Sequence, residues 1–269
     1  MKVDLCMWTL NGAKTLEPVL ERINRVIPVG CVGQRLIVDD GSTDETVKIA
    51  GACGWRVIRN EGKGISDGAN TALKNVETEW FCSFEQDLLL ASDWWLKVSA
   101  FMVEGVGCVQ GMRFSSVDAL SLMEQEHYKR FKTLYVSIDN NLFRKAAVEA
   151  VGGFPSGCPV CTDSILRNKM LLDGRFKWVI LDNVLSTHIR GSLGYAVNHA
   201  YAQNRLCNRT HLCSSNLDAS RFRMTRLFLT SPFRAVFLFA NTKTPSVFLY
   251  YPYLRLRLLQ SELVRGGKL

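Results

Sequence analysis

Hydrophobic and polar positions in the first half of the chain follow two alternating periods. Short apolar runs, several with a two-residue repeat, predict strands over residues 2–8, 35–39, 55–59, 79–84 and 106–112. Apolar positions three and four apart predict helices over residues 15–27, 44–51, 66–76 and 93–103. Because a helix between consecutive strands is the usual crossover of a parallel sheet, we expect an α/β fold with a mostly parallel sheet and helices on both faces.

The second half of the chain has a looser pattern. Residues 117–131 and 164–172 are predicted as helices, and residues 176–181 as a further strand. From about residue 194 the pattern is helical, and Pro232, Pro245 and Pro252 divide it into short pieces. We therefore predict one domain over residues 1–190, with halves at 1–112 and 113–190, and a helical extension over residues 191–269.

Polar residues follow three of the predicted strands. In parallel α/β sheets the carboxyl ends of the strands meet at one edge, and ligands bind there. The residues brought to this edge are Thr9, Leu10 and Asn11, then Asp39, Asp40 and Asp44, and then Glu85, Gln86 and Asp87. Asp44 has a structural explanation, because an aspartate at that place caps the following helix. Asp40 has no such explanation and is the better ligand candidate.

The triplet Glu85-Gln86-Asp87 admits two interpretations. On a strand, positions two apart point the same way, so the two carboxylates could converge on one ligand. Alternatively, the strand has an acidic end without a function. The triplet alone does not decide between these interpretations.

Charge is unevenly distributed along the chain. Residues 190–269 hold 12 lysines and arginines against Asp218 and Glu262, whereas residues 1–189 hold 21 against 23 acidic residues. The basic C-terminal region indicates an anionic partner, such as a membrane surface, a nucleic acid or a phosphate-bearing substrate. Its aromatic residues are interleaved with arginines, which favours an interfacial membrane helix; helices that only pack on the body are the alternative. The longest uncharged stretch near the C-terminus, residues 244–254, is too short to cross a bilayer.

The nine cysteines are odd in number and scattered, which favours reduced thiols and a cytosolic setting. Cys158 and Cys161 form a CxxC pair, and Cys207, His211 and Cys213 lie close together later in the chain. A zinc site made from both groups is the less favoured alternative, because 46 residues separate them.

Residues 38–46, VDDGSTDET, resemble the nucleotide-binding signature of family-2 glycosyltransferases, which have the Rossmann-like GT-A fold. Further segments resemble motifs of that family in the same order. These are the nucleotide-contacting turn at residues 9–11, the helix start GISDGAN at 64–70, the DxD motif at 85–87, and the acceptor-side segment at 141–145, 152–154 and 162–163. The resemblance covers roughly residues 1–190, so that 1–112 would bind the nucleotide-sugar and 113–190 the acceptor.

The resemblance implies a role for each matching residue. Asp163 would be the catalytic general base, and Asp87 and His188 would bind Mg²⁺ or Mn²⁺, which prefer such hard ligands. The donor would be bound by Thr9, Leu10, Asn11, Asp39, Asp40, Lys63, Asp67, Asn70, Glu85 and Gln86. Structural alternatives exist for three of the residues: a solvated loop lysine for Lys63, a helix cap for Asp163 and a structural histidine for His188.

Several positions depart from the family's pattern. Trp8 and Leu10 replace a usual proline and tyrosine, so stacking on the nucleotide is in doubt. Ala69 stands where an arginine is frequent, Thr162 replaces a glutamate, and Glu85 replaces the first aspartate of the DxD motif. None of these departures removes Asp40, Asp87 or Asp163.

The resemblance thus implies an inverting, divalent-metal-dependent enzyme that moves a sugar from a nucleotide diphosphate-sugar to an acceptor. A polyprenyl phosphate or a lipid-linked saccharide is the acceptor we expect. We expect the protein on the cytoplasmic face of the membrane, in peripheral contact through residues 191–269, with no nucleic-acid partner. The alternatives are a nucleotidyltransferase, a catalytically inactive sugar-binding protein and a nucleic-acid-binding protein that uses the basic C-terminal region.

Overall fold

The computed structural model describes residues 1–131, 136–156, 160–206 and 221–264. The chain forms two compact units. The first unit comprises Met1–Arg113 and Tyr135–Ile189, and the second comprises Phe114–Leu134 and Arg190–Leu269. The second unit thus includes residues 114–134, and their helical pattern in the sequence does not reveal which helices they pack against.

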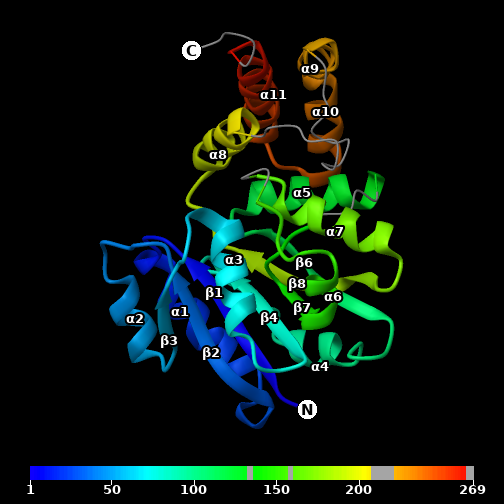
Figure 1. Ribbon diagram of the computed structural model, residues 1–269. Helices are drawn as coiled ribbons and strands as arrows, with labels where there is room; N and C mark the ends of the chain where they lie inside the picture. Colours follow the sequence, from blue (N-terminus) through cyan, green and yellow to red (C-terminus); the bar gives the residue numbers. More distant parts are fainter. Residues whose placement is uncertain (132–135, 157–159, 207–220, 265–269) are drawn as a thin grey trace. The chain divides into compact units, whose positions relative to one another are not determined.

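The first unit is built on an eight-stranded sheet (Figure 1). Its strand order is β3 (Arg56–Arg59), β2 (Val32–Asp39), β1 (Val3–Thr9), β4 (Trp80–Glu85), β7 (Asn141–Arg144), β6 (Val106–Ser115), β8 (Lys177–His188) and β5 (Leu88–Leu89). The four strands from β3 to β4 pair in parallel. The pairs β4–β7, β6–β7 and β5–β8 are antiparallel. The predicted α/β class with a GT-A-like sheet is confirmed, although the sheet is mixed beyond β4, where β7 enters between β4 and β6.

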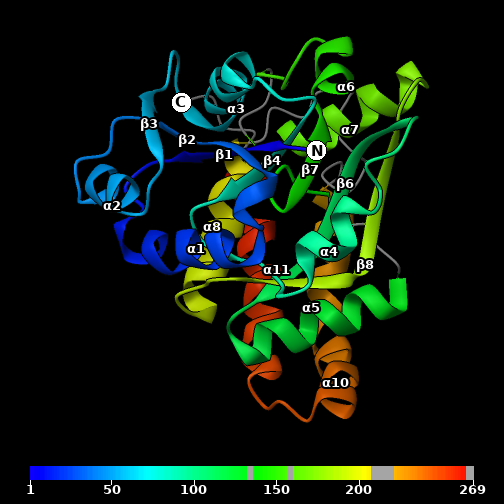
Figure 2. The ribbon, with the colours of Figure 1, turned by 90° about the horizontal axis from the view of Figure 1, so that it is seen from below.

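Helices cover both faces of this sheet, as the alternation of the sequence predicted (Figure 2). One face packs against α1 (Ala13–Val26), α2 (Thr46–Ala52) and α4 (Trp94–Ser99). The other packs against α3 (Gly64–Asn75), α6 (Lys145–Ala150) and α7 (Thr162–Asp173). A short 3₁₀ turn, Val29–Cys31, precedes β2.

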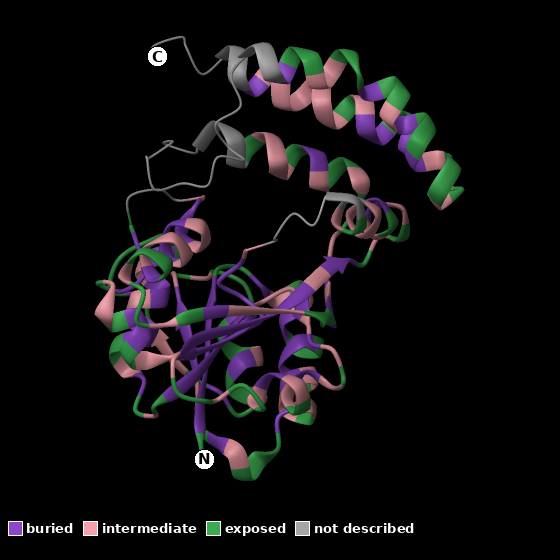
Figure 3. Ribbon diagram, turned by 90° about the vertical axis from the view of Figure 1, so that its right-hand side faces the viewer, coloured by how far each residue is buried: buried purple, intermediate pink, exposed green. Residues whose placement is uncertain are grey.

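The period of two in β1 decides which core each side chain joins. Leu5 and Met7 pack with the cluster on the α1 side, whereas Cys6 and Trp8 pack with the cluster on the α3 side. The strand is buried along its whole length, as expected for a parallel strand that is covered on both faces (Figure 3). The polar residues that end β1 therefore stand on a rigid, fully packed support.

The second unit is helical. It contains α5 (Asp118–Phe131), α8 (Leu193–Leu206), α9 (Arg221–Leu229), α10 (Ser231–Thr242) and α11 (Val247–Val264). Its core includes Leu120 and Met123 of α5, Val197 of α8 and Tyr251 of α11. None of the helices in the described ranges combines the length and the apolar character that a bilayer crossing requires.

Free thiols in the described ranges include those of cysteines 6, 31, 53, 82 and 108. Burial raises the pKa of the thiols of Cys6, Cys82 and Cys108. Cys158, Cys207, His211 and Cys213, from which the zinc hypothesis was built, lie outside the described residues.

Candidate active site

The end of β1 is tied to the end of β4 by Gln86. Its side-chain Oε1 accepts hydrogen bonds from the Thr9 hydroxyl and from the Leu10 backbone N–H, the latter at 3.1 Å. Its Nε2 donates to the Leu10 carbonyl at 3.3 Å. Gln86 therefore shapes the 9–12 turn, while the Leu10 side chain is 48% exposed.

The 9–12 turn is joined in the same way to the loop after β2. Asn11 has a left-handed backbone with φ of 50°, and its Oδ1 accepts the Thr43 backbone N–H at 2.9 Å. Its own backbone N–H donates to Ser42 Oγ at 2.8 Å. Asp39 Oδ2 accepts the backbone N–H groups of Gly41 and Ser42, whereas Asp39 Oδ1 is buried and has no hydrogen-bond partner among the described residues.

Asp40 is held at the mouth of a cavity of about 450 Å³. Its Oδ1 accepts Asn60 Nδ2–H at 2.9 Å, and its Oδ2 accepts the Gly64 backbone N–H at 2.9 Å. Lys63 and Arg59 line the same cavity. The structure thus brings together Asp40 and Lys63, which were predicted separately, and adds Arg59, which the sequence reasoning did not single out.

Asp44 contacts the starts of two helices, although the expected cap position of α2 is occupied by Glu45. Its Oδ1 accepts the Thr46 backbone N–H at the start of α2, and its Oδ2 accepts the Ala13 backbone N–H at the start of α1. The Thr46 hydroxyl bond is the main cause that lowers the pKa of this exposed carboxyl. Asp44 therefore fixes the helix starts that flank the site.

Glu85, Asp87 and His188 come together as a group that could hold a metal ion. Their ligand atoms all lie within 4.8 Å of one another. The antiparallel β5–β8 ladder places His188 opposite Leu88, and His188 Nε2 lies 3.0 Å from Asp87 Oδ2. Two carboxylates and one imidazole suit a hard divalent cation such as Mg²⁺ or Mn²⁺, with coordination positions left for phosphate oxygens or water.

Arg113 of β6 adds a positive charge beside this group. Its Nη1 lies 2.9 Å from His188 Nδ1, 3.3 Å from Glu85 Oε2 and 2.8 Å from Asp139 Oδ2. Burial lowers the pKa of Arg113, but the neighbouring carboxylates of Asp139, Glu85, Asp87 and Asp163 outweigh burial and raise it above its ordinary value. Arg113 therefore stays positively charged and partly neutralises these four carboxylates.

The segment before β7 holds Asp139 in place. Asp139 is fully buried, and the adjacent Asn140 donates to the Met112 carbonyl of β6 at 3.0 Å. The Gly111 backbone N–H donates to the Asn140 carbonyl, and a Cβ on Gly111 would lie 2.8 Å from Asn140 Nδ2. Only glycine permits this close approach of the 137–140 segment to β6.

Asp163 lies in the first turn of α7. Burial raises the pKa of its carboxyl from 3.8 to about 6, against the opposing effects of the Ser164 backbone N–H and of Arg113. The Asp163 carboxyl interacts electrostatically with Arg113 and Asp139. The alternative role as a helix cap is wrong, because α7 begins at Thr162 and Cys161 occupies the cap position.

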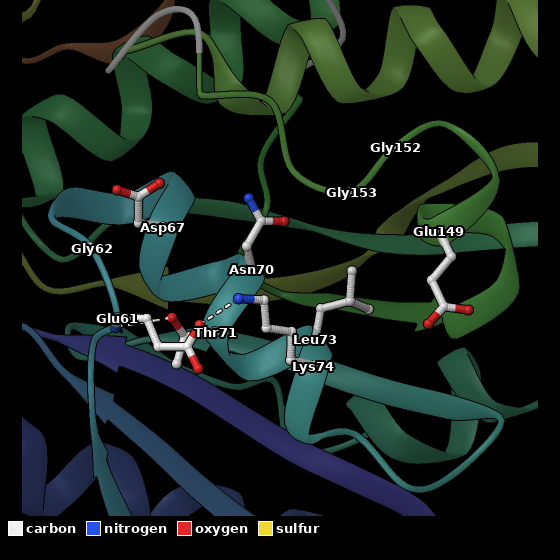
Figure 4. A pocket seen from close by; sticks show the side chains of 10 residues that line it. All are labelled: Glu61, Gly62, Asp67, Asn70, Thr71, Leu73, Lys74, Glu149, Gly152 and Gly153. Carbon is white, nitrogen blue, oxygen red and sulfur yellow. Dashed lines mark hydrogen bonds and ion pairs between the residues drawn. The ribbon is translucent and has the colours of Figure 1, made fainter.

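Asp67 and Asn70 lie on α3 and line a second cavity of about 650 Å³ (Figure 4). Asp67 Oδ2 accepts the Lys63 backbone N–H at 2.9 Å. The Asn70 amide is shared with the backbone of Phe154: its Nδ2 donates to the Phe154 carbonyl, and its Oδ1 accepts the Phe154 N–H, both at 2.8 Å. Neither this cavity nor the smaller one beside Asp40 is lined by a member of the metal-binding group.

Asn70→Ala is expected to lower the free energy of unfolding by about 1–3 kcal/mol, because both backbone groups of Phe154 would lose their partner. Thermal or urea unfolding measures this change. Asn75→Ala, on the same helix, is the matched control, because Asn75 donates only to the Thr71 carbonyl within α3. Equal effects of the two substitutions would contradict the positioning role of Asn70.

Arg113 and Asp139 were missed by the sequence reasoning. A signal for Arg113 was present, since an arginine within a largely apolar, buried strand needs a charged partner. Asp139 carried no comparable signal, because SIDNN at 137–141 resembles an ordinary polar loop. The hydroxyl of Thr162, at a departure from the family pattern, contacts Ser66 of α3 at 2.6 Å and thereby joins α7 to the donor-side half.

The α/β sheet thus carries, after the carboxyl end of β4, side chains that could hold a metal ion. The model of glycosyl transferase family 2 matches residues 4–156, and the chain belongs to that family. The family match favours glycosyl transfer over nucleotidyl transfer. A search of curated proteins finds no match.

Solved structures give the same result for the fold. A mannosyltransferase from Pyrobaculum calidifontis, in complex with GDP-Man and Mn²⁺, is 16% identical with a TM-score of 0.69, over 98% of this chain and 86% of that chain. S. aureus TarS, in complex with UDP-GlcNAc, is 14% identical with a TM-score of 0.57, over 97% and 89% of the two chains. Glucosyl-3-phosphoglycerate synthase from Mycobacterium tuberculosis, in complex with Mn²⁺, UDP and its product, is 17% identical with a TM-score of 0.56, over 72% and 74%.

Proposed function

We propose that the protein is an inverting, divalent-metal-dependent glycosyltransferase that uses a nucleotide diphosphate-sugar. The observation that carries the proposal is the convergence of Glu85, Asp87 and His188 at the ligand-binding edge of the sheet, within a family-2 chain. Two of the structural neighbours were determined with Mn²⁺ and a nucleotide or nucleotide-sugar, which supports the same pairing here.

The donor would lie along the ends of β1, β2 and β4. Asp39 Oδ1, buried and without a hydrogen-bond partner among the described residues, is suited to accept an N–H of the base. Asp40 and Lys63 line the adjacent cavity, where the lysine ammonium can reach a phosphate. Thr9, Leu10 and Asn11 would line the pocket as a turn that Gln86 holds in shape.

Asp87, His188 and Glu85 would hold the cation, which, when bound, neutralises negative charge on the leaving diphosphate. The acceptor hydroxyl attacks the anomeric carbon, the bond from that carbon to the diphosphate oxygen breaks, and the configuration inverts. Asp163 takes the hydroxyl proton, and its raised pKa suits that task near neutral pH. The positive charge of Arg113 would offset the negative charges of Asp139 and Glu85, with which it forms ion pairs.

We further propose that the acceptor is a polyprenyl phosphate or a lipid-linked saccharide, used at the cytoplasmic membrane face. The basic composition of residues 190–269 supports the proposal that the enzyme acts at an anionic membrane surface. If the acceptor is itself a phosphate, its oxygen is already a nucleophile, and Asp163 orients it instead of removing a proton.

Thermal unfolding with a panel of UDP-, GDP-, dTDP- and CDP-sugars, with and without Mn²⁺, tests the proposed function. A donor at about 100 times its Kd should raise Tm by roughly 5 °C, with the rise dependent on Mn²⁺, because ligand binding stabilises only the folded state. The same panel with Asp93→Asn, an exposed carboxylate paired with Lys97, should reproduce the wild-type shifts. Absence of a metal-dependent shift with every donor would refute the proposal.

A further inference from the structure

One side of α10 in the second unit exposes only apolar residues over residues 231–240. The exposed positions there are Pro232, Phe233, Val236, Phe237 and Ala240. The Phe233 side chain is 78% exposed and Val236 is 58% exposed. Spacings of three and four residues place Phe233, Val236, Phe237 and Ala240 on one face, which we call the outer face of α10.

The opposite side of α10 already serves the core. Ser231, Ala235 and Leu238 are buried, and Ala235 and Leu238 belong to one cluster with Val247 and Tyr250 of α11. Ala235 and Leu238 thus serve the packing against α11, whereas Phe233 and Val236 are exposed. A helix that is apolar on its exposed side as well as on its core side indicates a surface that binds something apolar.

Exposed leucines also occur shortly before and shortly after α10 in the sequence. Leu229, the last residue of α9, is 65% exposed, and Leu249, in the first turn of α11, is 80% exposed. The helices α10 and α11 pack against each other, and the rings of Phe239 and Phe248 are 5.1 Å apart.

The surroundings of the outer face are basic. Residues 221–264 hold seven arginines and lysines against the single acidic residue Glu262. Arg226 and Lys243 are exposed and stand before and after α10, with Lys243 in a left-handed backbone conformation directly after the helix. Such an arrangement fits an anionic membrane interface, because apolar side chains can contact the acyl chains while the cations contact the anionic headgroups.

We infer that the second unit docks on an anionic lipid bilayer by inserting the outer face of α10 into the interfacial layer. With 12 residues, α10 is about 18 Å long, so it lies in the interface and does not cross the bilayer. A nucleic acid fits this face less well, because phosphate contacts need cations where the outer face has only apolar side chains.

Co-sedimentation of the full chain with vesicles tests this inference without any measurement of catalysis. The wild type should bind phosphatidylcholine vesicles that contain phosphatidylglycerol, and bind weakly to phosphatidylcholine alone. Phe233→Asp with Val236→Asp should weaken binding at least about tenfold, because two charges would enter the apolar layer. Arg226→Glu with Lys243→Glu should reduce the difference between the two vesicle compositions.

Leu96→Asp with Leu172→Asp is the matched control, since these leucines of the first unit are 76% and 78% exposed. This control should bind vesicles as the wild type does, and all variants should keep the wild-type circular dichroism and Tm. Undiminished vesicle binding by the Phe233 and Val236 variant overturns the inference. Concentration-dependent self-association without vesicle binding, lost in that variant, also overturns it and makes the outer face a contact between copies of the chain.

Discussion

Asp87→Asn is expected to lower kcat/KM by about 10²–10³-fold or more, the loss typical when one electrostatic stabiliser of a transition state is removed. Asp87 lies between β4 and β5, and its carboxylate lies 3.0 Å from His188 Nε2. An amide is nearly isosteric but carries no charge, so the affinity for Mn²⁺ should fall together with turnover.

Two measurements separate this role from a structural one. Titration of Mn²⁺ by calorimetry or paramagnetic relaxation should show weaker binding in Asp87→Asn, while circular dichroism and Tm without metal stay close to the wild type. Asp93→Asn is the same substitution at an exposed site six residues further on and should leave metal binding unchanged. Wild-type Mn²⁺ affinity in Asp87→Asn would contradict its role as a ligand.

Asp163→Asn is expected to reduce kcat by about 10²–10⁴-fold, the usual contribution of a general base, while the donor and Mn²⁺ still bind. In the wild type, the activity should fall as pH decreases through about 6, because protonation of Asp163 removes the base. Steady-state kinetics from about pH 5 to 8 measures this profile.

The same substitution should stabilise the fold at neutral pH. The folded-state pKa of Asp163 is raised above its ordinary value, so folding favours the protonated form, and this stabilisation is lost as pH rises through about 6. Asparagine remains neutral and can still accept the Ser164 N–H, so Asp163→Asn should gain roughly 1–3 kcal/mol at pH 7.

Asp173→Asn at the other end of α7 is the control, since that carboxylate pairs only with its neighbour Arg175 in the described contacts. It should change neither turnover nor its pH profile. If Asp163→Asn keeps the wild-type kcat at pH 7, Asp163 is not the base. The acceptor would then supply its own charged oxygen.

Much of the fold was predictable because its signals are local. The period of two in the strands and the three- and four-residue spacing in the helices depend only on neighbours along the chain. The four parallel strands and their crossover helices were therefore predicted to within a few residues. β7 was not predicted as a strand, because its four residues acquire their role only by pairing between β4 and β6.

Part of the candidate site was predictable for a related reason. Strand-end residues such as Asp40 and Asp87 follow periodic segments, and the carboxyl ends of parallel strands share an edge. Their individual contacts were not predictable. Gln86 and Asn70 were expected to bind the donor. In the structure their side-chain amides form hydrogen bonds with the backbone of Leu10 and Phe154. These backbone groups are far away in the sequence, so the contacts depend on the tertiary fold.

The sequence by itself determined the α/β class, the strand-end carboxylates and the basic character of the C-terminal region, because composition and periodicity are properties of the chain. Only the tertiary structure placed His188 beside Asp87, 101 residues away, through the β5–β8 ladder. It also placed Arg113 among the carboxylates and buried Asp163, which raises the pKa of that group. Burial and electrostatic coupling arise between segments that are far apart in the sequence, so no local pattern encodes them.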